Sequence, residues 1–244
     1  AWQAGLRGIV RAFSSYFFIL IPAGHIWKFV TLAYIPPTIA GVVLAYRKKY
    51  LLGGVITALF IALQIQSNHI QMSYYFMFVI LFFIIAYFVD AYEKKELPHF
   101  FKASAILALA AVVGVCVNIS NLYHTYEYSK ETMRGKSELK QEGPAANQTS
   151  SGLDRDYITN WSYGIGETLT LLVPNVKGGG CSTTLSQNET AMAKANPMYG
   201  NLYSQLTPYF GDQPWTAGPV YVGAFVVFLF ILGCFIVKGP LKWA

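Results

Sequence analysis

The stretch LLGGVITALFIALQIQSNHIQMSYYFMFVILFFIIAYFV (residues 51–89) decides the fold. Two apolar runs, 51–66 and 72–89, flank a short segment that is crowded with amide side chains and one histidine. A single helix of these 39 residues would be nearly twice as long as the hydrocarbon core of a bilayer, about 30 Å, is thick. The stretch is therefore predicted to form a transmembrane helical hairpin, with the polar segment as its turn.

The rest of the chain has the same membrane character. Of its 244 residues, 54% are hydrophobic and only 12% are charged, about half the charged fraction of a soluble domain. Other apolar segments lie at 12–23, 26–46, 104–121 and 219–237. Together with the hairpin they predict an all-α, polytopic transmembrane bundle of about six spans. We expect an internal portion of a larger membrane protein, with spans in 1–121, an outer segment at 122–218 that contains short interfacial helices, and a last span in 219–244.

The positive charges of the chain predict its orientation. If the spans alternate in direction, one side of the membrane receives ten basic residues: Arg7, Arg11, Arg47, Lys48, Lys49, Lys94, Lys95, Lys102, Lys238 and Lys242. Because cytoplasmic loops carry an excess of Lys and Arg, this side is predicted to be the cytoplasm, and residues 122–218 to be extracytoplasmic. The formal net charge of +6 then reflects topology and contact with membrane lipid, and no nucleic-acid partner is expected.

The outer segment carries acids close in sequence to aromatic side chains. A carboxylate can accept the proton of a hydroxyl group, and a flat aromatic ring can stack on the face of a sugar. The candidate catalytic residues are Asp154, Asp156, Glu167 and Asp212, and the candidate substrate-binding residues here are Arg155, Tyr157, Trp161, Tyr163 and Trp215. The structural alternative stays open: the first two acids would cap a helix that starts near Tyr157, and the tryptophans would anchor the loop at the membrane surface.

The hairpin turn holds more polar residues than helix packing needs. On a helix, Asn68, Gln71 and Tyr75 would share one face, which Gln64 continues. Interhelical hydrogen bonds, at about 1 kcal/mol each, would explain one or two of the amides. We expect a group of residues to form the membrane-side floor of an outward-facing site: Gln64, Asn68, His69, Gln71 and His25. Because no third ligand accompanies the two histidines, no metal site is predicted, and no cofactor is firmly implied; a divalent metal ion is left open.

Local breaks in the chain give three further expectations. Pro36 and Pro37 are predicted to interrupt the span 26–46, because proline lacks the N–H group that a helix needs; the break would either line a substrate groove or be a packing kink. The segment GETLTLLVP (166–174) is predicted to form a short amphipathic helix on or in the bilayer surface. The triple glycine at 178–180 is predicted to be a hinge, in preference to a phosphate-binding loop.

Longer motifs carry a family resemblance. They are AGHIWKF (23–29), NHIQMSYYFMF (68–78), LDRDYITNWSYGIGETLTLLVPNVKGG (153–179) and YFGDQPWTAGPVYVGA (209–224). With these motifs the chain resembles the YfhO family of bacterial multi-pass membrane proteins, in a Bacteroides-type form. That family is grouped with the GT-C type of integral-membrane glycosyltransferases, so the resemblance implies a GT-C-like fold in the bacterial cytoplasmic (inner) membrane.

The resemblance also implies the reaction and its partners. A GT-C enzyme would transfer sugar from a polyprenyl-phosphate carrier, at the extracytoplasmic face, to an acceptor that is a cell-envelope glycan or lipid. The catalytic acid of such enzymes typically lies in the first outer loop. We expect that loop to lie outside this chain, which would then hold the groove for the carrier lipid and part of the acceptor surface.

Two other functions remain as alternatives. A transporter or flippase of a lipid-linked or polar solute is favoured by the amide-rich turn and the Pro–Pro break. It is opposed by FMFVILFFIIAYF (76–88), which has no charged or amide side chain, because coupled transport uses such groups inside the membrane. A noncatalytic subunit of a membrane assembly is the third reading.

Overall fold

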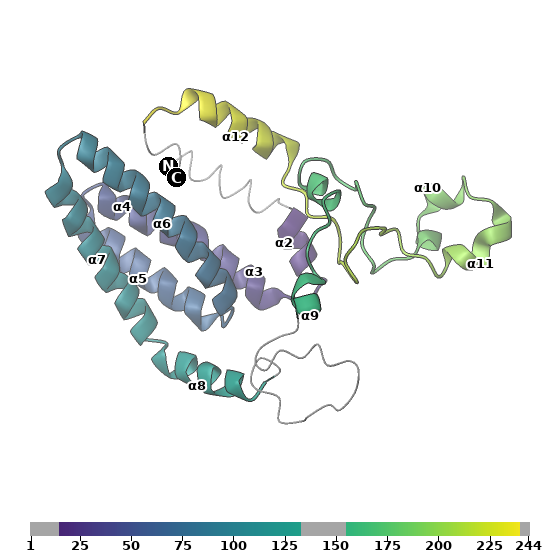
Figure 1. The fold of residues 1–244 in the computed structure, drawn as a ribbon, viewed down its shortest axis with the longest axis horizontal. Helices are drawn as coiled ribbons and strands as arrows, with labels where there is room; N and C mark the ends of the chain where they lie inside the picture. The colour runs from purple at the N-terminus through teal and green to yellow at the C-terminus, as the bar shows by residue number, and fades with distance from the viewer. Residues whose placement is uncertain (1–14, 133–154, 240–244) are drawn as a thin grey trace. The chain divides into compact units, whose positions relative to one another are not determined.

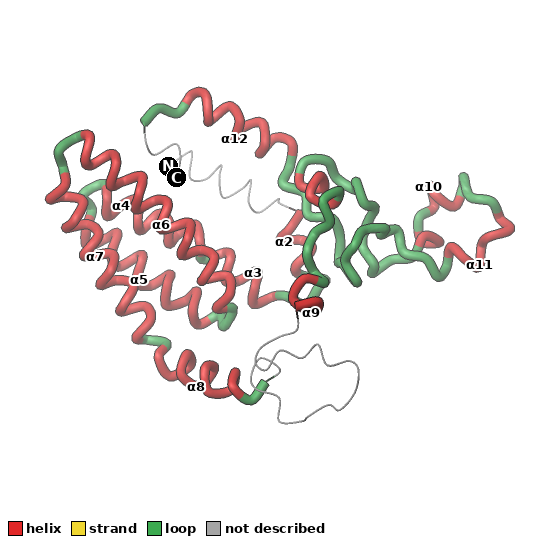
Figure 2. The backbone as a smooth tube through the Cα atoms, in the orientation of Figure 1, coloured by secondary structure: helices red, strands yellow, loops and turns green. Residues whose placement is uncertain are grey.

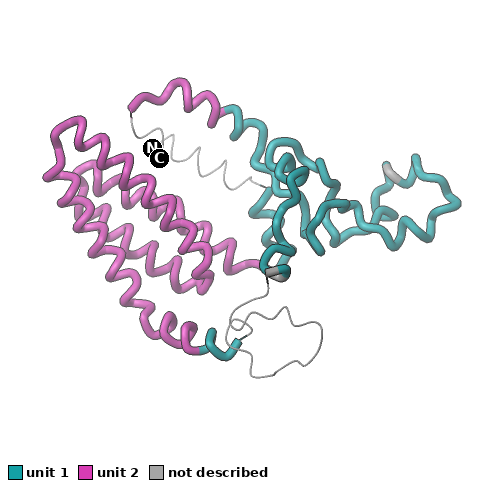
Figure 3. The backbone as a smooth tube through the Cα atoms, viewed as in Figure 1, with its two compact units in different colours: residues 1–24, 128–228 teal, residues 25–127, 229–244 magenta. Residues whose placement is uncertain are grey.

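The computed structural model describes residues 15–132 and 155–239 (Figure 1). These residues form helices and irregular segments and contain no strand (Figure 2). A single isolated β-bridge among them joins Gly178 and Tyr209. The chain divides into two compact units, which Figure 3 colours separately. We call residues 25–127 with 229–244 the helical unit, and residues 1–24 with 128–228 the loop unit.

The helical unit is built from long apolar helices joined by tight turns. They are α3 (Ile26–Ala33), α4 (Ile35–Tyr46), α5 (Tyr50–Gln66), α6 (Ile70–Glu93) and α7 (Leu97–Cys116), and they are followed by α8 (Ile119–Lys130). Helix α12 (Ala224–Ile236) begins in the loop unit and ends in the helical unit. The hairpin predicted from the opening stretch is confirmed, because only residues 67–69 separate α5 from α6.

Three stretches of the described residues are long and apolar enough to cross a membrane, which indicates a membrane protein. They are Ile26–Tyr46, Ile70–Glu93 and Leu97–Cys116. Helix α5, with 17 residues, and α12, with 13, are apolar but shorter. The segment predicted at 219–237 becomes helical only at Ala224, after a proline at position 219 and a positive φ of 103° at Gly223. Only six residues of the segment 12–23, α2 (Ser15–Leu20), are described as helix, so the count of six spans stays a prediction.

Close backbone contact holds the centre of the helical unit together. Helix α5 packs mainly against α4 and α7. A methyl group at Gly53 would lie 2.5 Å from the backbone nitrogen of Ala45 and 2.7 Å from the carbonyl oxygen of Gly41. Since such distances are well inside van der Waals contact, only glycine lets α4 and α5 approach this closely.

The predicted interruption of the span 26–46 is confirmed. Helix α3 ends at Ala33 and α4 begins at Ile35, with the two prolines in the first turn of α4, where their missing N–H groups cost least. The two prolines take the usual helical donors from the carbonyl oxygens of Leu32 and Ala33. The next carbonyl oxygen, that of Tyr34, accepts from the backbone N–H of Thr38 at 3.2 Å and from the Thr38 hydroxyl group at 2.8 Å. Regular helical hydrogen bonding therefore resumes directly after the break.

The basic residues of two turns share one end of the helical unit. The ammonium group of Lys48, between α4 and α5, lies 3.0 Å from the carboxylate of Glu96, between α6 and α7. Lys102 lies 4.7 Å from the centre of the Tyr50 ring. This grouping agrees with the pattern from which the orientation was predicted, while the assignment of that end to the cytoplasm stays a prediction.

Apart from the ends of α8 and α12, the described residues of the loop unit form short helices. They are α2, α9 (Arg155–Thr159), η1 (Glu167–Leu171), η2 (Leu185–Gln187), α10 (Glu189–Met192), η3 (Pro197–Tyr199) and α11 (Gly200–Tyr203).

The backbone of the triple glycine at 178–180 packs closely against another segment of the loop unit. Gly178 has a φ of +81° and bridges to Tyr209, and a methyl group at Gly180 would lie 2.7 Å from the carbonyl oxygen of Ala217. Close packing of two segments, and not a hinge, therefore explains these glycines.

Candidate functional site

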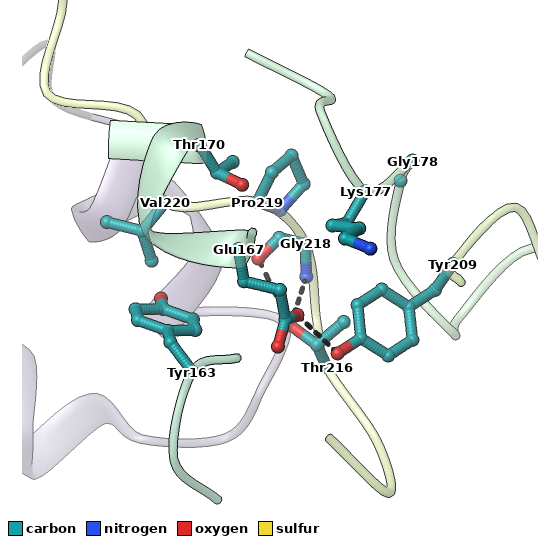
Figure 4. A pocket seen from close by; sticks show the side chains of 11 residues that line it. Tyr163, Glu167, Thr170, Lys177, Gly178, Tyr209, Thr216, Gly218, Pro219 and Val220 are labelled. Atoms are coloured by element: carbon teal, nitrogen blue, oxygen red, sulfur yellow. Dashed lines mark hydrogen bonds between the residues drawn. The ribbon is translucent and has the colours of Figure 1, made fainter. Parts of the chain in front are cut away.

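Glu167 is buried in the loop unit, with only 4% of the residue exposed. It is the first residue of η1, and its carboxylate oxygen Oε2 accepts hydrogen bonds from the backbone N–H groups of Gly164, at 2.9 Å, and Asp212, at 3.3 Å. The other oxygen, Oε1, accepts a hydrogen bond from the hydroxyl group of Tyr209 (Figure 4). A buried carboxylate is thus satisfied by donors from two segments that are far apart in the sequence.

The same two segments are joined by further hydrogen bonds around Tyr209. Its hydroxyl oxygen accepts from the backbone N–H of Gln213 at 2.8 Å. The side-chain amide of Gln213 donates to the carbonyl oxygen of Trp161 at 2.9 Å. Residues 161–167 and 209–213 therefore form one hydrogen-bonded network, which we call the Glu167 clasp.

The clasp determines the charge state of both of its central groups. Burial alone would raise the pKa of Glu167, but the hydrogen bonds from Tyr209 and two backbone N–H groups outweigh burial and lower the pKa below its usual 4.5. Burial and the hydrogen bond to Glu167 raise the pKa of Tyr209 to about 12. Near neutral pH, Glu167 is therefore an ionised acceptor and Tyr209 a neutral donor. A carboxylate held in this state cannot serve as a general acid.

A small pocket opens beside the clasp. It is lined by Tyr163, Glu167, Thr170, Lys177, Gly178, Gly179, Tyr209, Thr216, Gly218, Pro219 and Val220. Figure 4 shows Lys177, Tyr209 and Thr216 around the carboxylate of Glu167. The half-buried Lys177 acts electrostatically on Glu167 but makes no ion pair within 4.0 Å in the part of the chain that the structure describes. Its ammonium group can therefore bind an anionic group of a ligand.

A second carboxylate, that of Asp212, lies next to the clasp and is exposed. A methyl group at Gly164 would collide with its Oδ2 atom, so the carboxylate lies directly over the Gly164 backbone. Two exposed tryptophans belong to the same segments: Trp161, whose carbonyl oxygen accepts from Gln213 in the clasp, and Trp215, three positions after Asp212. The arrangement offers one cation, one free carboxylate and aromatic faces, which suits a ligand with both an anionic group and hydroxyl groups.

The structure brings together several residues that the sequence predicted for the site. Trp161, Tyr163, Glu167 and Asp212 belong to the clasp or the pocket, and Trp215 immediately precedes a pocket residue. Asp156 is exposed on α9. Arg155 and Tyr157 lie on the same helix, with side chains that are not described, and Asp154 lies outside the described residues.

Sequence reasoning missed Lys177 and Tyr209. Lys177 is the one basic residue in VPNVKGGG (173–180), and an isolated cation next to glycines could have marked it. Tyr209 lies inside a motif that carried the family resemblance, but no local pattern shows that a tyrosine will reach a carboxylate 42 positions away.

The predicted residues of the hairpin turn lie in the helical unit, and one expectation about them is wrong. Asn68 does not share a helical face with Gln71 and Tyr75, because it lies in the turn between α5 and α6, with a positive φ of 55°. The pair Gln71 and Tyr75 is confirmed, since the amide of Gln71 donates to the Tyr75 hydroxyl at 2.9 Å. Gln64 is 3% exposed, and its Nε2 atom has no hydrogen-bond partner among the described residues.

Two of the histidines of the helical unit, His25 and His69, interact electrostatically. Burial, the charge of Lys28 and, to a smaller extent, His25 lower the pKa of His69. His69 also has a buried Nδ1 atom without a partner among the described residues. Because each unit is described by itself, the expectation that these residues form the floor of a site in the outer segment stays a prediction.

The described ranges contain no group of three or more His, Cys, Asp or Glu side chains that could hold a metal ion. The chain matched no family model, no curated protein and no solved structure. The family resemblance of the sequence therefore stays a prediction.

Proposed function

We propose that this chain is a portion of an integral-membrane glycosyltransferase that transfers sugar from a polyprenyl-phosphate carrier to a cell-envelope acceptor. The observation that carries the proposal is the pocket beside the Glu167 clasp, which is lined by a cation, Lys177, and by Glu167. The exposed carboxylate of Asp212 adjoins the clasp, because the backbone N–H of Asp212 donates to Glu167. A lipid-linked sugar phosphate has the matching groups, an anionic phosphate and a ring with hydroxyl groups. The motifs that resemble the YfhO family support the same assignment.

Each group of the site has a role in this reaction. The acceptor hydroxyl oxygen forms a bond to the anomeric carbon of the sugar, while the bond from that carbon to the phosphate oxygen breaks. The hydroxyl proton passes to the carboxylate of Asp212, and the carrier leaves as polyprenyl phosphate with its charge offset by the ammonium of Lys177. Tyr163 and Trp161 offer faces for stacking on the sugar. Glu167 holds the two segments in register and does not transfer a proton.

The charges of the described candidate spans favour this proposal over transport. Lys28, Lys102, Asp90 and Glu93 all lie near the ends of their helices. Coupled transport through a bilayer typically uses ionisable groups at depth.

The test is the envelope glycan made by cells that carry variants of the full-length protein. Lys177→Ala and Asp212→Ala are each expected to lower glycan transfer roughly tenfold or more. Lys194→Ala and Glu189→Ala are the controls, since both residues are exposed in the same unit and lie outside the pocket. A wild-type glycan level in both Lys177→Ala and Asp212→Ala, with normal amounts of protein in the membrane, would overturn the proposal.

A further inference from the structure

The η1 segment has two chemically different sides. Glu167 and Thr170 are 4% and 7% exposed and line the pocket, whereas Leu169 and Leu172 are 55% and 52% exposed. A 3₁₀-helix has three residues per turn, so residues three apart lie above one another. The spacing therefore separates a buried polar side (167 and 170) from an exposed apolar side (169 and 172).

Neighbouring residues extend the apolar side. We call Ile165, Leu169, Leu172 and Val173 the apolar patch; Ile165 is 97% exposed and Val173 is 56% exposed. Four large aliphatic side chains within nine positions, all more than half exposed, are unusual on a surface that faces water. Something apolar is expected to cover them.

Hydrogen bonds connect the patch to the start of an apolar helix. The carbonyl oxygen of Leu171 accepts from the backbone N–H of Val222 at 3.1 Å, and Val222 lies two residues before α12 begins at Ala224. The next residue back, Tyr221, is paired twice with Ser15 of α2: its N–H donates to the Ser15 hydroxyl at 2.8 Å, and that hydroxyl lies 2.9 Å from the Tyr221 carbonyl oxygen. These hydrogen bonds connect the segment that carries the apolar patch to the residues just before α12, and they connect those residues to α2.

We propose that the apolar patch inserts into the outer leaflet of the lipid bilayer. Its occupant is lipid because the patch is continuous, through Leu171 and Val222, with a helix whose thirteen residues, AFVVFLFILGCFI, are all apolar or glycine. The other side of η1 then faces the pocket from the membrane surface, so a ligand that is itself anchored in the membrane reaches Glu167 and Lys177 without leaving the lipid. This insertion does not depend on the glycosyl-transfer proposal.

The experiment measures lipid contact of single positions in the full chain, in lipid nanodiscs. Cys116, Cys181 and Cys234 are first replaced by serine, since they are free thiols. A fluorescent NBD label is then attached at Leu172→Cys, and separately at Ile165→Cys in case the first variant folds poorly. The control is Met198→Cys, because Met198 is 83% exposed in η3 of the same unit and lies far from η1 in the chain.

Insertion predicts a blue-shifted emission at positions 172 and 165, and quenching by lipids with a doxyl group near the headgroup that is about twofold or more stronger than at position 198. Emission and quenching equal to those at position 198 would place the patch in water and overturn the proposal. A blue-shifted label that doxyl lipids do not quench would show that protein covers the patch, which would also overturn it. If Lys177→Ala and Asp212→Ala both leave the envelope glycan intact while the labels are quenched by lipid, only the glycosyltransferase proposal fails.

Discussion

The helical unit and the loop unit are held together by different interactions. In the helical unit α4 and α5 approach until a methyl group at Gly53 would meet the backbone of Ala45 at 2.5 Å, so shape and small residues dominate. In the loop unit, segments with little regular structure are joined through the carboxylate of Glu167. Packing spreads the stability of the helical unit over many contacts, whereas in the loop unit the single side chain of Glu167 accepts three hydrogen bonds, so one substitution there should have a large effect.

The largest effect is expected from Glu167→Ala. The substitution leaves the Tyr209 hydroxyl and two backbone N–H groups without their acceptor, and we expect the loop unit to lose about 3–5 kcal/mol of stability. Hydrogen–deuterium exchange should increase across residues 161–213, while exchange in α5 and α7 stays unchanged. Glu189→Ala is the control, since Glu189 is an exposed acid of the same unit. Equal loss in both units would show that they do not depend on separate interactions.

The same contrast explains what the sequence could predict. Apolar runs of helical length identified the hairpin and the spans 26–46 and 72–89, because burial in lipid leaves a continuous local signal. The Glu167 clasp joins residues 42 positions apart through side-chain hydrogen bonds, which leave no periodicity in the sequence. Thus Glu167 could be predicted as a site residue because aromatic residues lie near it in the sequence. That Tyr209 donates a hydrogen bond to it could not be predicted.

Element ends were harder to predict than elements. The last span was expected from position 219, but backbone with a positive φ at Gly218 and Gly223 delays α12 to Ala224. Likewise the fifth apolar segment was expected to continue to 121, yet α7 ends at Cys116 and α8 begins at Ile119. The buried Asn118, whose side chain donates to the carbonyl oxygen of Ala62 at 2.9 Å, lies in this break. Hydropathy averages over such single residues.

A substitution at Gly53 should destabilise the helical unit, as Glu167→Ala should destabilise the loop unit. Gly53→Ala should force α4 and α5 apart and destabilise the helical unit by about 2 kcal/mol, because the new methyl group meets backbone that cannot rotate away. Thermal unfolding in detergent would measure the loss. Gly233→Ala is the control: a methyl group there has no neighbour within 4 Å, so no loss, or a small gain from helix propensity, is expected. A neutral Gly53→Ala would contradict close packing as the main interaction.

Low pH should destabilise the loop unit but not the helical unit, and this effect should be smaller than those of the two substitutions above. The folded pKa of Glu167 is lowered, so its contribution to stability is complete above the ordinary value of 4.5 and is lost as the pH falls through the lower folded value. Below pH 4.5, protease cleavage within residues 161–213 should therefore become faster while the helices stay protected. In Glu167→Gln this additional sensitivity to acid should disappear. A variant that keeps the full acid sensitivity would show that another group is responsible.

Gln64→Leu replaces a buried polar side chain of the helical unit, and its expected effect on stability is the smallest of the four. Gln64 is 3% exposed, and its Nε2 atom has no partner among the described residues, so the structure carries the desolvation cost of an unused donor. Leucine of similar size should remove that cost and raise stability by about 1 kcal/mol in detergent. Gln71→Leu is the control, because Gln71 donates to Tyr75 at an exposed position and should change little or slightly lose stability. A clear loss in Gln64→Leu would mean that the amide is paired in the membrane, by water or by a bound polar group, and that polar contacts help to hold the helical unit as well.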